Sequence, residues 1–116
     1  MVIQNAKQLI YEQIMKWAGV SAAPHNRGPR GTAWFVDEVE IGHIHGNSLV
    51  DIALPHETVE EVVAAGRAQP HHMFPKLGIS VPLDTREDVE RAIELLRLSY
   101  NLIRQKQGLD PAQNGD

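Results

Sequence analysis

EIGHIHGNSLVDIALP, residues 40–55, is the stretch that decides the fold of this chain. Isoleucine and valine recur on both sides of Gly46 and Asn47, a pattern typical of two strands joined by a tight turn. Pro55 cannot donate a hydrogen bond to a neighbouring strand, so it ends the second strand. The stretch therefore predicts an antiparallel β-hairpin.

Two further strands are predicted, one just before the hairpin and one well after it. Residues 34–36 have the bulky side chains that strands favour, and Asp37 with Glu38 turns the chain back into the hairpin. Residues 79–83 form a short strand, in which Pro82 predicts either a sheet edge or an early end.

Apolar residues at helical spacing predict three helices. They cover residues 6–18, residues 57–66 and a long last helix that begins near residue 84. Asn5 is a suitable N-cap for the first helix. The last helix starts with a capping box, formed either by Asp84 with Glu87 or by Thr85 with Asp88.

The remaining segments are predicted to be irregular. Residues 20–31 and 67–78 are punctuated by proline and glycine, which is typical of connecting loops. The element order is therefore α-β-β-β-α-β-α, which favours an α+β fold: a single antiparallel sheet of about four strands with helices packed on one face. We expect one domain over residues 1–107 and a flexible polar tail over residues 108–116.

The composition excludes several classes of function. The chain has 116 residues and no cysteine, which excludes disulfide scaffolds and thiolate metal sites. Residues 1–31 contain four basic and one acidic residue, whereas the remainder contains seven basic and fourteen acidic residues, so most of the chain would repel nucleic acid. No apolar run approaches the roughly 18 residues of a membrane helix. We expect a cytoplasmic protein whose partner is a small molecule, with a homodimer left open.

Two pairs of histidines are the first candidates for chemistry. His43 and His45 are two residues apart in a predicted strand, so they project from the same face about 6.6 Å apart. Such a pair suits a metal site, a ligand pocket, or a purely structural role in a protein-interaction module. His71 and His72 lie in the second predicted loop. Because both ends of that loop join the sheet, we expect it to bring at least one of them to the His43 and His45 pair.

The register of the hairpin decides which carboxylate joins the histidines. A two-residue turn places His43 opposite Val50 and puts Asp51 on the other face, whereas a three-residue turn places Asp51 opposite His43. We favour the two-residue turn because it keeps the apolar residues together on the histidine face, which would then line the turn end of the core.

The carboxylates complete the set of candidate site residues. In the favoured register Asp51 is separated from the histidines, so no tightly bound metal and no cofactor are expected; in the other register His43, His45 and Asp51 would be the metal ligands. Glu40, an exposed strand carboxylate, is a further candidate. The candidate ligand-binding residues are Glu40, His43, His45, Asp51, His71 and His72.

Three segments of the chain resemble the luciferase-domain family, which is named after fungal luciferases and includes many small bacterial proteins. They are residues 40–55, residues 65–83 (AGRAQPHHMFPKLGISVPL) and residues 87–100 (EDVERAIELLRLSY). The matching positions are Glu40, Gly42, His43, His45, Gly46, Asp51, His71, His72, Pro75, Gly78, Ser99 and Tyr100. The resemblance covers about residues 33–104.

This resemblance carries a limited functional implication. Fungal luciferases are oxygenases that act on a pyrone luciferin, so any enzymatic activity implied by the resemblance is oxygenase-like. Many relatives have tryptophan after the glycine where this chain has Ile79, and a pocket built on that aromatic ring would be altered here. A family name does not carry a reaction with it, so function depends on the site.

Overall fold

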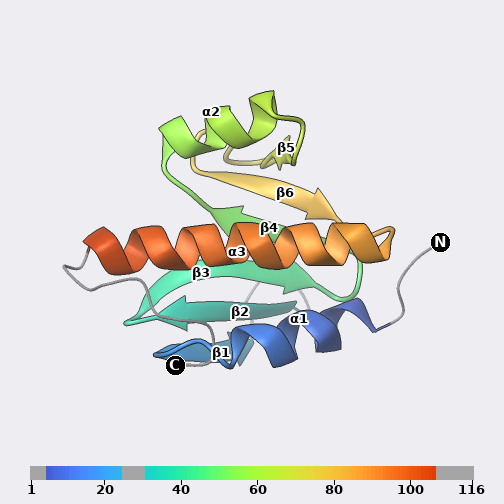
Figure 1. Ribbon diagram of the computed structural model, residues 1–116, viewed down its shortest axis with the longest axis vertical. Coiled ribbons are helices and arrows are strands. Elements are labelled where there is room, and N and C mark those ends of the chain that lie inside the picture. The colour runs from blue at the N-terminus through green and yellow to red at the C-terminus, as the bar shows by residue number, and fades with distance from the viewer. Residues whose placement is uncertain (1–4, 25–30, 107–116) are drawn as a thin grey trace.

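A single antiparallel sheet organises the structure (Figure 1). The computed structural model describes residues 5–24 and 31–106, and within these ranges the sheet has six strands in the order β1-β2-β3-β4-β6-β5. The strands are β1 (Val20–Pro24), β2 (Gly31–Val36), β3 (Val39–His45), β4 (Leu49–Ala53), β5 (Gln69–Pro70) and β6 (Gly78–Pro82). The helices are α1 (Ala6–Ile14), α2 (His56–Ala64) and α3 (Arg86–Lys106).

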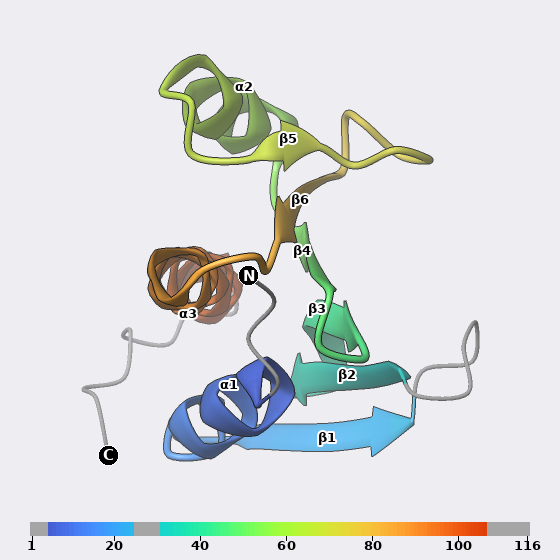
Figure 2. The same ribbon diagram turned by 90° about the vertical axis from the view of Figure 1, so that its right-hand side faces the viewer.

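All three helices lie on the same side of the curved sheet (Figure 2). The core between these layers is apolar, with Trp34, Ile44, Val50 and Leu96 fully buried. The predicted α+β class, the antiparallel sheet and the one-sided packing of the helices are therefore confirmed. No helix among the described residues is long and apolar enough to cross a membrane.

The sheet is larger than the predicted four strands. Residues 20–24 were expected in a loop but form β1, because Val20 to Pro24 pair with Val36 to Thr32 of β2. The two-residue β5 lies in the second predicted loop and pairs with β6. Both strands depend on a partner strand rather than on their own composition. The rest of the first loop and the predicted tail, residues 25–30 and 108–116, lie outside the described residues.

The helix caps correct one prediction and decide another. Asn5 makes no side-chain cap bond; instead Oδ1 of Asn47, in the hairpin turn, accepts a hydrogen bond from the backbone N–H of Lys7 at 2.9 Å. At the start of α3 the capping box is formed by Thr85 and Asp88, each of which accepts the other's backbone N–H. The first helix is thus capped by the hairpin and not by its own sequence.

The favoured hairpin register is wrong. His45 lies opposite Leu49 and His43 opposite Asp51, so the turn holds the three residues 46–48. The apolar side chains are nevertheless kept together, because a β-bulge between β2 and β3 leaves Ile41 as an extra residue on β3. The bulge interrupts the strict alternation, so both Ile41 and Ile44 are buried although they are three residues apart. The prediction failed because it assumed an unbroken period of two.

Candidate functional site

The histidine pair lies on the open face of the sheet, not on the core face that the favoured register predicted. His43 is opposite Asp51, and Asp51 is opposite Ser80 of β6, so these side chains project from three neighbouring strands on one face. Gly42, the neighbour of His43, points the other way: a Cβ there would lie 2.8 Å from Cδ2 of Leu96 in α3. The site therefore sits on the side of the sheet away from the helices.

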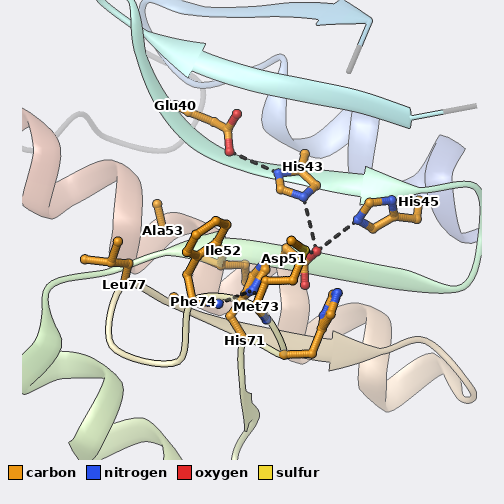
Figure 3. Close-up of a pocket in the computed structure, with 12 residues that line it drawn as sticks. Glu40, His43, His45, Asp51, Ile52, Ala53, His71, Met73, Phe74 and Leu77 are labelled. Atoms are coloured by element: carbon orange, nitrogen blue, oxygen red, sulfur yellow. Dashed lines mark hydrogen bonds and ion pairs between the residues drawn. The ribbon is translucent and has the colours of Figure 1, made fainter. Parts of the chain in front are cut away.

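Asp51 is the centre of the cluster (Figure 3). Its Oδ2 lies 2.9 Å from Nε2 of His45 and 3.1 Å from Nε2 of His43, and its Oδ1 accepts a hydrogen bond from the hydroxyl of Ser80. Burial alone would raise the pKa of this carboxyl, but the hydrogen bonds from His43, Ser80 and His45 lower it well below its ordinary range. Asp51 is therefore a buried carboxylate ion held by donors from its two neighbouring strands, His43 and His45 of β3 and Ser80 of β6.

His43 lies between two carboxylates. Its Nε2 faces Asp51, and its Nδ1 lies 3.0 Å from Oε2 of Glu40. Glu40 reaches the open face because of the bulge: it pairs with Phe35, while His43 pairs with Ala33 two residues away. Burial alone would lower the pKa of His43, but the hydrogen bonds to Asp51 and Glu40, together with their charges, raise it to about 9. His43 is therefore an imidazolium at neutral pH.

His71 joins the cluster from the loop between β5 and β6. Its Nε2 lies 3.5 Å from Oδ2 of Asp51, and its Nδ1 accepts hydrogen bonds from the backbone N–H groups of Met73 and Phe74. Because Nδ1 accepts, the ring proton is on Nε2, which faces the cluster. Burial is the main factor that lowers the pKa of His71, so this ring is neutral. The expectation that the loop brings a histidine to the strand pair is confirmed.

The other residues of this loop form an exposed wall. The ring of His72 stacks on that of His71 with centroids 4.8 Å apart, and His72 itself is exposed. Met73, Phe74 and Leu77 are 56%, 45% and 67% exposed, so they do not fill the core. They line the same cavity as the cluster.

The cavity measures about 760 Å³ and has two kinds of wall. One wall is polar and contains the carboxylates and the histidines; the other is apolar and comes from the end of β4 and the loop. The lining residues are Glu40, His43, His45, Asp51, Ile52, Ala53, His71, His72, Met73, Phe74, Leu77 and Gly78. All six candidate residues thus line one cavity, and this arrangement is typical of small-ligand sites.

The cluster also has metal-ligand chemistry. Ligand atoms of His43, Asp51 and His71 all lie within 4.8 Å of one another. A metal-bound histidine usually donates its other ring N–H to an acceptor. His43 fits this pattern, because Glu40 is the acceptor at its Nδ1. His71 does not fit, because its Nδ1 accepts from the backbone. The reason for expecting no metal, the separation of Asp51 from the histidines, no longer holds.

Sequence reasoning missed Ser80 as part of the site. Ser80 is 5% exposed and orients Asp51. The sequence feature that could have identified it is a single hydroxyl residue between Ile79 and Val81 in a short apolar strand. Because side chains alternate along a strand, Ser80 must lie on the face opposite to these two apolar neighbours. Which strand it would face depends on the sheet order, and that order has no local signal.

Comparison with known proteins gives the family. No curated protein and no solved structure matches the chain. The family model described as the Luciferase domain matches residues 38–99, more than half of the 116 residues. The match begins at the turn before β3 and ends within α3, so it contains the whole histidine cluster and the apolar loop residues that line the same cavity. This chain belongs to the Luciferase domain family.

Proposed function

We propose that the cavity binds a small organic molecule through the histidine cluster and the apolar loop wall. The observation that carries this proposal is the placement of the two walls: Nε2–H of His71 is fixed toward the cavity by two backbone donors, and the exposed side chains of Met73, Phe74 and Leu77 face it. A rigid donor and an exposed apolar surface in the same cavity favour a ligand that has a polar head and an apolar body.

The charge of the cluster favours a neutral polar head. Asp51 and Glu40 carry two negative charges, His43 carries one positive charge, and His71 is neutral. A hydroxyl or carbonyl oxygen can accept from a ring N–H, and a hydroxyl can also donate to the half-buried carboxylate of Glu40. A carboxylate ligand would meet the carboxylates of Asp51 and Glu40, so we expect alcohols, phenols and carbonyl compounds to bind better than carboxylates.

A chemical step in this cavity would use His43 as a proton donor. Its ring holds two protons between two carboxylates, and a positioned histidine is a common general acid. Membership of the family does not identify a reaction, so binding is the proposed function and His43 is the residue through which a proton would move.

A divalent metal is the second candidate for the same site. His43 and His45 each direct Nε2 toward Oδ2 of Asp51, and Glu40 accepts from the far nitrogen of His43. Two histidines and one carboxylate are a common ligand set for Fe, Zn and Mn. Metal at one equivalent per chain after mild chelation, measured by elemental analysis of purified protein, would favour this candidate over the first.

A fragment screen tests the proposed function. Ligand-observed NMR with neutral hydroxyl and carbonyl fragments should give hits whose binding is lost in Phe74→Ala and weakened in His43→Gln. His56→Gln is the matched control, because His56 is an exposed histidine that pairs with Glu60 on α2. Hits that bind all three variants equally, or a screen without hits, would contradict the proposal.

A further inference from the structure

A second chamber adjoins the histidine cavity. It measures about 520 Å³ and lies between the end of β4, the start of β3 and the last turns of α3. In Figure 1 the red end of α3 lies at the same end of the sheet as the start of β3. The lining residues are Val39, Glu40, Ala53, Leu54, Pro55, Leu77, Ser99, Leu102, Ile103 and Lys106. Apart from Glu40, Ser99 and Lys106, these residues are apolar.

The two chambers share Glu40, Ala53 and Leu77. None of these three residues is buried, and Leu77 is 67% exposed. The boundary between the chambers therefore includes the small side chain of Ala53 and the exposed side chain of Leu77, which can change rotamer. The cleft can thus continue from one chamber to the other around the end of β4.

We propose that the two chambers form one cleft for an elongated ligand, a neutral hydroxylated head with a long aliphatic tail. The head binds among the histidines, as the proposed function requires, and the tail passes Leu77 into the second chamber to lie against Leu102 and Ile103. Glu40 is the polar residue at the junction, where its carboxylate is held by His43 and can accept from the hydroxyl of the head.

Residues 107–116 are poor occupants for the second chamber. The residues after Lys106 are QGLDPAQNGD, in which Leu109 is the one large aliphatic side chain. An apolar groove of this size gains little from a single leucine among polar residues. A ligand tail continuous with the first chamber is the occupant that the shared lining favours.

The test is a homologous series of 4-n-alkylphenols, from phenol to 4-octylphenol. These probes are neutral near pH 7, have a hydroxyl head and differ only in the tail. Each tail methylene that enters the second chamber should tighten binding by about threefold to fourfold, the effect of burying one CH₂. Calorimetry gives the dissociation constants, and NMR shifts of the His43 ring and of the Leu102 methyls report head and tail contact separately.

Leu77→Trp is the variant that blocks the junction, since an exposed position tolerates a larger side chain without repacking the core. It should remove the dependence of the dissociation constant on chain length. Leu102→Trp, which fills the second chamber, should do the same. Met15→Trp is the control, because Met15 is an exposed apolar residue at the end of α1 and lines neither chamber.

Each outcome separates the two proposals. Phenol binding at His43 without any gain from longer tails would overturn the elongated cleft and leave the proposed function standing. If longer tails still tighten binding in both Leu77→Trp and Leu102→Trp, the elongated cleft is also overturned. If Leu109→Asn tightens the binding of the long-tailed phenols, Leu109 competes with the tail for the second chamber. That result would overturn the proposal by making the end of the chain the natural occupant. If no probe shifts the His43 ring, the proposed function fails and the inference fails with it.

Discussion

Nε2 of His43 lies 3.1 Å from Oδ2 of Asp51, although the two residues are on different strands and on either side of a three-residue turn. They form a directly opposed pair on the open face of the sheet. This contact exists only in one register of the hairpin, so the charge state of the site is tied to the way in which the two strands pair.

The first prediction is a pH dependence that comes from His43. The pKa of its ring is raised from 6.5 to about 9 in the folded chain. The stability that this proton contributes is therefore complete below about pH 6.5 and is lost as the pH rises through about 9. The Cε1–H shift of His43 should titrate near pH 9, and urea unfolding at rising pH should show the loss. In Glu40→Gln the pH midpoint of the His43 titration should fall, because one of the two carboxylates that raise its pKa is lost. Titration of His43 near pH 6.5 in the wild-type chain would contradict the ion cluster.

The second prediction compares the two strand histidines. His43→Ala leaves the carboxylates of Asp51 and Glu40 without a shared partner, and it should lower the free energy of unfolding by about 1–3 kcal/mol. His45→Ala should cost less, because His45 is more exposed and Asp51 keeps its bonds to His43 and Ser80. Denaturant melts of both variants measure the difference. Equal losses, or a more stable His43→Ala, would show that the cluster does not hold the strands together.

The third prediction concerns the cap of α1. Asn47→Ala removes the acceptor for the N–H of Lys7, and it should destabilise the chain by about 0.5–2 kcal/mol. Asn5→Ala is the matched variant at the predicted cap position, where the side chain makes no cap bond, and it should cost much less. Chemical denaturation of the two variants distinguishes them. A larger loss for Asn5→Ala would mean that the helix is capped by its own sequence.

The fourth prediction concerns the contact between β3 and α3. A Cβ at Gly42 would meet the carbonyl oxygen of Asp51 at 2.6 Å and Cδ2 of Leu96 at 2.8 Å, so Gly42→Ala must move both the backbone beside the site and the Leu96 side chain of α3. We expect a loss of about 1–3 kcal/mol. At Gly66 a Cβ meets nothing within 4 Å, and the cost of Gly66→Ala is limited to its φ of +73°, about 1 kcal/mol. Thermal melts should rank Gly42→Ala as the more damaging change.

The sequence by itself determined the class of the fold and six of the residues that line the cavity. Helical spacing and strand alternation are local patterns, so they predicted the three helices, the central hairpin and the shared face of His43 and His45. The family likewise followed from short motifs whose order is fixed along the chain. The Thr85 and Asp88 capping box was also visible, as one of two alternatives, because both partners lie within one turn of helix.

Only the tertiary structure decided how those residues meet. The register that brings Asp51 to His43, the bulge that turns Glu40 toward the same ring, and the loop that delivers His71 are relations between elements that no local pattern of one strand encodes. Asn47 shows the reason: the turn that sets the register also bonds to Lys7, forty residues earlier. A one-residue slip moves every side chain of a strand to the other face, and the choice between two such states is made by the summed contacts of the whole sheet and its helices.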